Sequence, residues 1–546
     1  MKKGRIVVAA ILLTAMLGGC GDSPGMSSQT PTPGNVQSTA SPGAQTPESN
    51  FEGYPLKAED TTISWWVGAG FLPNSAYGSG DQSPFHSGLS EMTGVKIEWQ
   101  FPTAGTDASQ AFNLMLASDT LPDIIYYGLI SDAGRYIDEG IIRDLSDNIA
   151  DYSPAYYQFL QTDPVYDKSM KTDSGQYYGY GFFREDGGWN DSYLGPVIRQ
   201  DWLDALGLSA PKTISDWDKV LSAFKDKYNA KLSFAWSRFK TTGISGAFGS
   251  YSAIDHRVYI DDNGKLQSAQ AQPQWKTYMA KLNEWWKAGL IDQDVLTMTD
   301  TDAQTKALNG NIGISVTSMG QVSNWEKDAD KAGNGAKWTG LQYPTGDDGT
   351  LSMVFGGRGI GGEVSVVTTS CTEEKLETVM RVLDYAYTDE GHLYWNFGKE
   401  GVSWEYDSEG KPAYTDLVTK DPDGLNNAID KYGGSTWSGS TIQATLLLYL
   451  KNTKTAVEAN DLWFYPNEAV TTKHNMPRVT FTVDESNRLA ELNAPINTYV
   501  SETAVKYLVG EESLDTFDSF VAKLYDMGLQ EVLDINQAAY DRFLAR

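Results

Sequence analysis

Three consecutive stretches, residues 92–101 (MTGVKIEWQF), 111–118 (AFNLMLAS) and 121–127 (LPDIIYY), decide the fold class of this chain. In the first, a Thr-Gly turn precedes alternating apolar residues, which predicts a half-buried strand. The second is predicted to be helical, and the third is a short apolar run typical of a buried strand. Strand, helix and strand at this spacing indicate a parallel α/β sheet.

The same reasoning extends the α/β pattern along the chain. We expect strands at 62–67, 312–316 and 364–368, a turn at 261–264, and helices at 215–227, 273–290, 303–308 and 373–387. Residues 514–543 also have a helical pattern. Ser215 is the expected N-cap of the helix that it begins.

Composition describes a folded, strongly acidic and aromatic-rich protein. The chain has 546 residues, 40% of them hydrophobic, with a net charge of −28, which is long enough for two large lobes. Such acidity argues against binding to nucleic acid or to an anionic membrane surface. Its two cysteines, Cys20 and Cys371, cannot build a disulfide framework or a four-ligand zinc site. The 16 Trp, 30 Tyr and 19 Phe residues suggest that some aromatic surface faces a ligand.

The amino-terminal segment is predicted to direct export and anchoring. A basic start is followed by an apolar run at 6–17 that is too short for a membrane span. The ending Leu17-Gly18-Gly19-Cys20 resembles a bacterial lipobox. We therefore expect residues 1–19 to be a lipoprotein signal peptide and Cys20 to carry lipid. The alternative is a membrane-retained or an ordinary cleaved signal with an incidental cysteine. Residues 20–57 are predicted to be a flexible Ser/Thr/Pro/Gly linker.

Motifs for common catalytic chemistry are missing from the sequence. It has no P-loop, H-E-x-x-H, C-x-x-C or G-x-S-x-G motif, and its four histidines lack metal-ligand spacing. Residues 357–362 match G-x-G-x-x-G, but a strand-like run follows where a nucleotide site needs a helix. We therefore expect no metal, no cofactor and no catalytic residue.

Several segments, taken in order, carry a resemblance to a known family. They are LMLAS (114–118) with LPDI (121–124), IRQDWLDALG (198–207), WWKAGLID (285–292), LDY (383–385) with EG (390–391), NFGKEGV (396–402) and NTYV (497–500). Together with the lipobox, this ordered set resembles the extracellular solute-binding lipoproteins of family 1. These are the carbohydrate-binding components of bacterial ABC importers, and the chain is most similar to the long branch that includes binders of alginate oligosaccharides.

This resemblance implies two α/β lobes of the periplasmic-binding-protein type (type II), joined by hinge crossings, with a ligand cleft between them. On this chain, one lobe would comprise 58–183 plus 355–400 and the other 184–354 plus 401–546. The glycines at 356–362 would then lie at a crossing, and closure would be a hinge motion. Long-branch members often carry a calcium loop after the helix that matches 215–227. Residues 225–231 (KDKYNAK) lack its alternating acidic pattern, so we expect no calcium there.

A sugar offers an apolar ring face and a rim of hydroxyl groups, which flat aromatic and planar polar side chains can bind. Candidates therefore stand at strand ends, at crossings or in loops. Arg184, Glu185 and Trp189 are expected in a Gly-rich polar loop at the first crossing, and Trp404 and Trp437 in loops of the second lobe. Core or loop packing is the alternative for each. The candidates are Trp65, Trp66, Tyr126, Tyr127, Arg184, Glu185, Trp189, Trp236, Arg238, Arg358, Trp404 and Trp437. Five other tryptophans fit helical stripes and are expected in cores: Trp217, Trp275, Trp285, Trp286 and Trp395.

The predicted function is capture of an oligosaccharide by a monomeric lipoprotein at the extracellular face of the cytoplasmic membrane, with delivery to ABC permease subunits. The acidic composition favours a neutral oligosaccharide, although a local basic cleft would reverse that argument. Two other functions are alternatives. A surface glycoside hydrolase or lyase would need a catalytic carboxylate pair. Because the chain has 71 acidic residues, the sequence does not identify such a pair. A receptor for peptides or other solutes would also use aromatic side chains.

Overall fold

The computed structural model describes residues 51–58, 60–68, 83–103, 105–118, 120–185, 189–241, 244–352, 359–436, 439–464, 466 and 473–546. The chain separates into two units, Met1–Glu48 and Ser49–Arg546, and the fold below is that of the second. Three of the predicted functional residues, Cys20, Arg358 and Trp437, lie outside the described residues.

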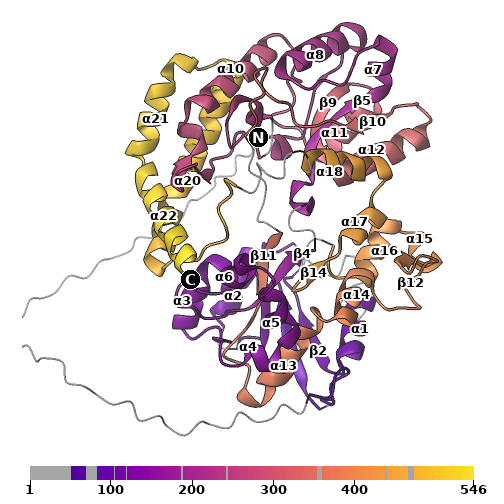
Figure 1. The fold of residues 1–546 in the computed structure, drawn as a ribbon, viewed down its shortest axis with the longest axis vertical. Coiled ribbons are helices and arrows are strands. Elements are labelled where there is room, and N and C mark those ends of the chain that lie inside the picture. Colours follow the sequence, from indigo (N-terminus) through magenta and orange to yellow (C-terminus); the bar gives the residue numbers. More distant parts are fainter. Residues whose placement is uncertain are drawn as a thin grey trace, which may run out of the picture. The chain divides into compact units, whose positions relative to one another are not determined.

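The predicted parallel unit forms one side of a six-stranded sheet (Figure 1). Strand β1 (Thr62–Val67) pairs in parallel with β2 (Lys96–Gln100) and with β3 (Ile124–Tyr127). Helices α1 (Pro84–Thr93) and α2 (Ala108–Leu116) connect these strands. The predicted strand, helix and strand at 92–127 are thus confirmed.

The rest of this sheet comes from distant parts of the chain. Its order is β14-β4-β11-β3-β1-β2. Strand β11 (Ile360–Val367) runs antiparallel between β3 and β4 (Tyr180–Arg184), and β14 (Ile442–Gln443) lies parallel to β4. Because the run at 357–362 ends inside β11, which continues to Val367, a strand stands where a dinucleotide site needs a helix.

A second, four-stranded sheet has the order β10-β5-β9-β6. Strand β9 (Ile312–Ser318) runs antiparallel to β5 (Leu194–Arg199) and parallel to β6 (Lys231–Leu232), while β10 (Trp338–Gly340) is antiparallel to β5. The predicted turn at 261–264 is confirmed, because it joins the hairpin strands β7 (Val258–Ile260) and β8 (Leu266–Ser268).

Helices accompany each sheet. The six-stranded sheet, with its helices, is called the first lobe; besides α1 and α2 it contains α3 (Ala133–Asp138), α4 (Ile149–Tyr152), α5 (Pro154–Leu160), α6 (Pro164–Ser169), α13 (Glu373–Tyr385) and α14 (Asp389–Phe397). The four-stranded sheet belongs to the second lobe, with α7 (Gln200–Leu206), α8 (Ile214–Tyr228), α9 (Trp236–Phe239), α10 (Pro273–Lys287), α11 (Asp300–Leu308), α12 (Met319–Ala332), α17 (Thr445–Lys451), α18 (Lys454–Phe464), α20 (Val483–Val509), α21 (Phe517–Asp526) and α22 (Leu529–Ala545).

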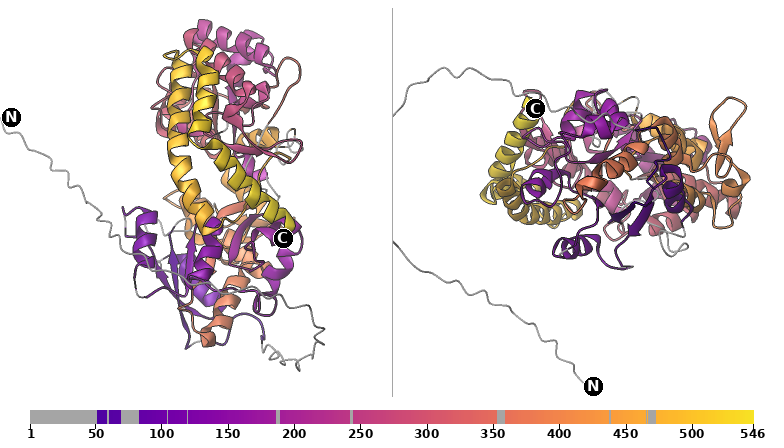
Figure 2. Two further views of the ribbon diagram at one scale, coloured as in Figure 1. Left: turned by 90° about the vertical axis from the view of Figure 1, so that its left-hand side faces the viewer. Right: turned by 90° about the horizontal axis from the view of Figure 1, so that it is seen from below.

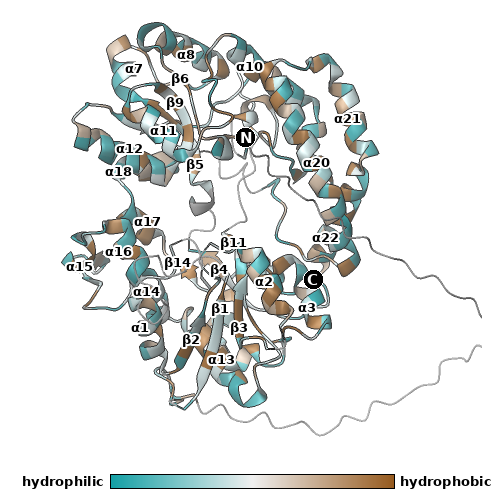
Figure 3. Ribbon diagram, turned by 180° about the vertical axis from the view of Figure 1, so that it is seen from behind, coloured by the Kyte–Doolittle hydropathy of each residue, from teal (hydrophilic) through white to brown (hydrophobic). Residues whose placement is uncertain are grey.

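Each lobe has its own hydrophobic core. One large cluster of buried apolar side chains draws on residues 63–183 and 360–395, and another on residues 189–343 and 448–533. Figure 3 shows apolar residues along the strands of the first sheet. Trp217, Trp275, Trp285 and Trp395 are almost completely buried, which confirms them as core residues, and Trp286 packs against the second core. The fold is therefore α/β with two lobes.

The segment 401–444, which the resemblance assigns to the second lobe, contacts the first. It contributes β14 to the six-stranded sheet, and a small satellite core joins Phe397 of α14 to Ile429 of α16 (Leu425–Tyr432). Just before this segment, Lys399 forms an ion pair with Glu91 of α1 at 2.6 Å. The chain therefore crosses to the second lobe after β14.

Among the helix boundaries that differ from the sequence-based expectation, two have a clear local cause. The N-cap of α8 is Thr213, not Ser215: its hydroxyl accepts from the backbone of Asp216, whose carboxylate accepts from the Thr213 backbone. This reciprocal capping box gives hydrogen-bond acceptors to two backbone N–H groups at the start of the helix, which a cap at Ser215 would leave without an acceptor. The predicted helix 514–543 is divided into α21 and α22 at Gly528, where φ is +101°.

The carboxyl end of α22 contacts the first lobe (Figure 2). Asp173, between α6 and β4, forms ion pairs with Arg542 and Arg546, each at 2.5 Å. Arg542 also pairs with Glu485 of α20 at 2.6 Å. Val165 of α6 packs beside the small cluster that includes Phe543. We call the group of Asp173, Arg542, Arg546 and Glu485 the interlobe ion cluster.

Candidate functional site

Three aromatic rings meet where β1 and β3 end. Parallel strands bring their carboxyl ends to one edge of a sheet, which is where such folds bind ligands. Tyr127, the last residue of β3, stacks on Phe112 of α2 with ring centroids 4.6 Å apart. Trp66 lies 6.0 Å from Tyr127 and 6.1 Å from Phe112. Tyr127 is half-buried and Trp66 is 5% exposed, so Tyr127 offers the more accessible ring.

The neighbouring candidates Trp65 and Tyr126 are buried in the first core. Successive side chains of a strand point to opposite faces, so Trp65 and Trp66 have different surroundings. Trp65 stacks on Trp99 at 4.9 Å and is 1% exposed. The Tyr126 hydroxyl accepts a hydrogen bond of 2.8 Å from the backbone of Gly439. Both side chains contribute to packing in this structure.

The first crossing from lobe to lobe holds three candidates with different surroundings. Arg184 ends β4 and is half-buried, with its guanidinium 5.7 Å from the Phe182 ring centre. Glu185 is exposed, and its carboxylate accepts from the backbone of Thr445 at the start of α17, at 2.9 Å. An acidic group suits this position because helix amino ends carry partial positive charge.

Trp189 begins the short helix η3 (Trp189–Ser192) and is 1% exposed. Its indole N–H donates to the Asp461 carboxylate at 2.8 Å, and its ring meets that of Tyr449 edge-on at 5.3 Å. It is therefore part of the second core in this structure, although the sequence placed it in a polar loop.

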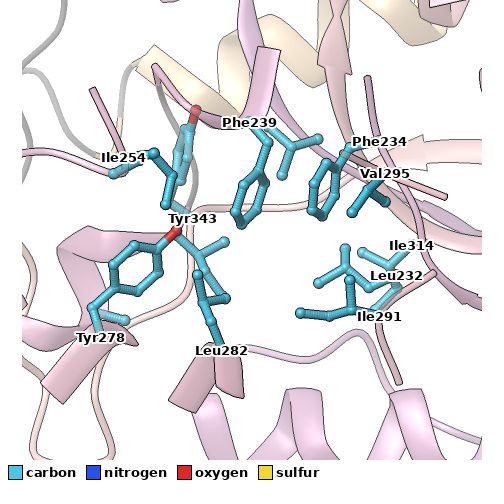
Figure 4. Close-up of a cluster of buried hydrophobic side chains, with 14 of the residues drawn as sticks. Leu232, Phe234, Phe239, Ile254, Tyr278, Leu282, Ile291, Val295, Ile314 and Tyr343 are labelled. Atoms are coloured by element: carbon cyan, nitrogen blue, oxygen red, sulfur yellow. The ribbon is translucent and has the colours of Figure 1, made fainter. Parts of the chain in front are cut away.

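In the second lobe, packing fixes the position of Trp236 and Arg238. Phe234 and Phe239, on either side of them, stack with ring centroids 3.8 Å apart inside the second core (Figure 4). This anchors the short helix α9, on which Trp236 stays half-buried. The Arg238 guanidinium pairs with Asp300 at 2.8 Å. Burial alone would lower the pKa of Arg238, but hydrogen bonds to Asp300 raise it.

Trp404 lies in a strand rather than in the expected loop. It begins β12 (Trp404–Tyr406), which pairs with β13 (Pro412–Tyr414). The side chain is 2% exposed, its indole N–H donates to the Gly398 carbonyl at 2.9 Å, and its ring packs in the satellite core. Apolar burial explains this tryptophan in the present structure.

A pocket of about 400 Å³ brings together residues of both lobes. Gly128, directly after β3, and Gly362 of β11 come from the first lobe. Arg257 precedes the β7–β8 hairpin of the second lobe, and Arg478 belongs to the segment that precedes α20. Neither arginine is predicted as a site residue from the sequence, because the two are 221 positions apart and no local pattern marks them.

Neither a metal cluster nor a membrane-spanning helix is found in the part of the chain that the structure describes. No group of three or more His, Cys, Asp or Glu side chains there could hold a metal ion. No described helix combines the length and the apolar character that a bilayer crossing requires.

These features define the class of protein: a two-lobed α/β protein of the periplasmic-binding-protein type. The sequence profile of bacterial extracellular solute-binding proteins matches residues 73–392, and the chain belongs to this family.

Two curated relatives are carbohydrate-binding proteins by name. The fructooligosaccharide ABC transporter substrate-binding protein FusA of Streptococcus pneumoniae serotype 4 is 23% identical over 544 residues, covering 92% of this chain and 94% of FusA. The polygalacturonan/rhamnogalacturonan-binding protein YtcQ of Bacillus subtilis (strain 168) is 24% identical over 448 residues, covering 78% and 82% of the two chains.

Solved structures share the fold. The alginate-binding protein AlgQ2 without calcium ion has a TM-score of 0.68 at 23% identity, covering 88% of this chain and 98% of AlgQ2. An HMO-binding solute-binding protein associated with an ABC transporter of Bifidobacterium longum infantis has a TM-score of 0.69 at 19% identity, covering 88% and 99%. The predicted family and two-lobed fold are confirmed.

Proposed function

We propose that this protein is the substrate-binding component of an ABC importer and captures an oligosaccharide between its two lobes. The observation that carries the proposal is that a relative named for fructooligosaccharide transport matches 92% of this chain. The aromatic group at the carboxyl edge of the first sheet supports it. Aromatic faces bind the C–H faces of sugar rings. The bound sugar is then delivered to permease subunits, and the protein itself catalyses no reaction.

The amino-terminal sequence supports a lipid anchor. A basic start, a short apolar run and Leu17-Gly18-Gly19-Cys20 are what lipid attachment at Cys20 requires. The anchor would hold the protein at the extracellular face of the cytoplasmic membrane. Cys20→Ser is expected to move the protein from the membrane fraction to the medium or to leave an uncleaved precursor, whereas Cys371→Ser should not. Equal membrane retention of the two variants with normal processing would contradict the anchor.

We assign ligand contact to the candidates that retain exposed surface. Tyr127 and Trp236 supply ring faces from the two lobes, with Trp66 supporting Tyr127. Arg184, Glu185 and Arg238 supply polar groups near the crossings. Four buried candidates, Trp65, Tyr126, Trp189 and Trp404, are left out of the proposed contact set because they pack in hydrophobic cores. Arg358 and Trp437 stay predictions from the sequence.

A thermal-shift screen of oligosaccharides and peptides tests the function. A ligand that binds only the folded state raises the unfolding midpoint by mass action. We expect shifts with oligosaccharides and none with peptides. The hydrolase or lyase alternative predicts new reducing ends on incubation, and the receptor alternative predicts shifts with peptides alone. A complete lack of shifts with glycans would refute the proposal.

Matched aromatic variants test the contacts. Tyr127→Ala and Trp236→Ala should each weaken oligosaccharide affinity by about tenfold, since a stacking contact is worth up to about 1.5 kcal/mol. Tyr127→Phe keeps the ring and should bind nearly normally. Tyr525→Ala removes an aromatic side chain that is 42% exposed on α21 and serves as the control. Titration calorimetry measures all four, and unchanged affinity of both alanine variants at the site would contradict the assignment.

A further inference from the structure

The crossings between the lobes leave the first sheet at one edge. Strands β1, β3, β4 and β14 all run in the same direction, because β11 is antiparallel to both β3 and β4. Their carboxyl ends therefore share an edge, which is where Tyr127 lies. The chain leaves this edge after Arg184 and after Gln443, and it returns to the edge at Ile360.

The second sheet also meets the first crossing at one edge. Strand β5 begins at Leu194, ten positions after β4 ends at Arg184. Leu194 pairs with Ser318, the last residue of β9, and β6 runs parallel to β9. The carboxyl ends of β6 and β9 therefore lie at the edge that the first crossing enters. Carboxyl edges of parallel strands are where α/β folds bind ligands.

Four side chains are positioned at this edge of the second sheet. Helix α9, which carries Trp236 and Arg238, follows β6 after three residues. Asp300 begins α11, and the Trp236 backbone N–H donates to the Met298 carbonyl at 3.3 Å, so α9 lies beside the start of α11. Tyr193 directly precedes β5. We call Trp236, Arg238, Asp300 and Tyr193 the second-lobe edge group.

The Asp300 carboxylate holds the Arg238 guanidinium by two of its nitrogens. Nε donates to the two carboxylate oxygens at 3.3 and 3.2 Å, and Nη2 donates to Oδ2 at 2.8 Å. Burial lowers the pKa of Arg238, but hydrogen bonding to Asp300 and to Tyr193 raises it above its ordinary value. Both partners of the ion pair keep 29% of their side-chain surface exposed. The guanidinium is therefore oriented by two other elements and still reaches the surface.

The carboxylate changes what this arginine suits. A guanidinium alone presents a planar fork and a positive charge, which match a carboxylate with two parallel hydrogen bonds. A ligand beside Arg238 meets a guanidinium whose Nε and Nη2 face Asp300, in a pair that carries no net charge. A sugar hydroxyl is neutral and needs only one donor, so it suits this pair better than a carboxylate does.

We infer that Asp300 is a positioning and specificity-determining residue: it orients Arg238 toward the hydroxyl rim of a sugar stacked on Trp236 and cancels the charge of the guanidinium. Tyr193 is a second positioning residue for the same guanidinium. This inference rests on the proposed function, because Arg238 and Trp236 contact a sugar only if an oligosaccharide binds between the lobes. It adds two residues, from α11 and from the first crossing, that act through Arg238.

The test uses the purified full chain and oligosaccharides in matched charged and uncharged forms. Fructooligosaccharides are titrated before and after oxidation of their primary hydroxyl groups to carboxylates, and oligogalacturonides before and after methyl esterification. Asp300→Asn keeps the size of the side chain and removes its charge. It should weaken binding of the uncharged form about tenfold, and it should raise the ratio of charged-form to uncharged-form affinity by about tenfold or more. Asp300→Glu keeps the charge and should leave this ratio nearly unchanged.

A double-mutant cycle separates positioning from a general effect on folding. Arg238→Gln removes the group through which Asp300 acts, so adding Asp300→Asn to it should cause no further loss of affinity. The matched control is Asp201→Asn. Asp201 is 25% exposed and pairs with Arg199 at 2.5 Å, at the opposite end of β5, so its loss should change neither the affinity nor the ratio. Far-ultraviolet circular dichroism and unfolding midpoints confirm folding of each variant.

The outcomes separate the inference from the function on which it rests. The inference is overturned, and the proposed function stands, if an oligosaccharide binds but Asp300→Asn leaves both the affinity and the ratio as they are in the unsubstituted protein. It is also overturned if the losses from Arg238→Gln and Asp300→Asn simply add. If no oligosaccharide of either series binds to the folded unsubstituted protein, the proposed function falls, and the inference falls with it.

Discussion

The interlobe ion cluster is expected to contribute measurably to the free energy of unfolding. Asp173 of the first lobe accepts from Arg542 and Arg546 at 2.5 Å each, and Thr480 donates to it at 3.1 Å. The Arg546 side chain is only 3% exposed, and its other described partners are the neutral Lys168 and Lys171 carbonyls and the Thr480 hydroxyl. Asp173→Ala would leave this cation buried without a carboxylate.

The magnitude follows from burial. Removing one partner of a fully buried ion pair costs about 3–5 kcal/mol. Asp173 is 23% exposed and Arg542 keeps Glu485, so water and the second carboxylate offset part of that cost. We therefore expect Asp173→Ala to lower the free energy of unfolding by about 2–3 kcal/mol, and Asp173→Asn by less, because the amide still accepts hydrogen bonds.

The assay is urea unfolding of the variants at pH 7 and at lower pH. Glu531→Gln is the matched control: it breaks the Arg488–Glu531 pair between the same two helices, α20 and α22, where both side chains are over 40% exposed and little stability is at stake. Although burial opposes it, hydrogen bonding to the two arginines lowers the pKa of Asp173. Its contribution is thus present above the unfolded-state pKa and is lost as pH falls below it.

The stabilities of Asp173→Asn and of the unsubstituted protein should therefore become progressively closer as pH falls below about 4. A loss for Asp173→Ala at pH 7 that is no greater than that of Glu531→Gln would refute the reasoning. So would a difference between Asp173→Asn and the unsubstituted protein that persists unchanged at low pH.

Three further predictions follow from buried groups. Burial raises the pKa of Asp384 to about 6, so the folded state binds this proton more tightly than the unfolded state. Ionisation of Asp384 therefore removes about 3 kcal/mol of stability as pH rises from about 4 to above 6. Asp384→Asn should abolish that part of the pH dependence in urea titrations, and an unchanged profile would be inconsistent with this reasoning. A Cβ atom built on Gly195 would lie 2.4 Å from the Trp463 ring, whereas one built on Gly320 would meet open space. Gly195→Ala should therefore lower the midpoint of thermal unfolding by the equivalent of about 1–3 kcal/mol, and Gly320→Ala should not lower it. Equal midpoints for the two variants would contradict this packing. The Cys371 thiol is fully buried, and burial raises its pKa to about 12. A thiol reagent should therefore label Cys371 in urea and not in the native protein. Rapid labelling of the native protein would show that the site opens.

Periodicity in the sequence was enough to predict the elements whose burial is regular. The strand, helix and strand at 92–127 have apolar residues at the spacing that each structure requires, and the structure confirms them. Tryptophans on helical stripes, such as Trp217 and Trp275, are buried as expected. The boundaries depended on local hydrogen bonds instead, as the capping box of Thr213 shows.

The site was less predictable because it is assembled from distant segments. Alternation shows that Trp65 and Trp66 face opposite ways, but which ring reaches the sheet edge depends on packing against Phe112 and Trp99. Trp404 was expected in a loop as a ligand contact, yet its side chain is buried. Arg257 and Arg478 share a pocket only through tertiary structure, which no local sequence pattern encodes.

The strand order of the first sheet has a consequence for biogenesis. The sheet begins with β1 at Thr62, but its edge strand β14 ends at Gln443, after the strands of the second sheet have been synthesised. A ribosome therefore releases most of the second lobe before the first can be completed. Because both sheets pair residues from distant parts of the chain, acquisition of the native state should be slow, and the incomplete chain should expose unpaired strand edges.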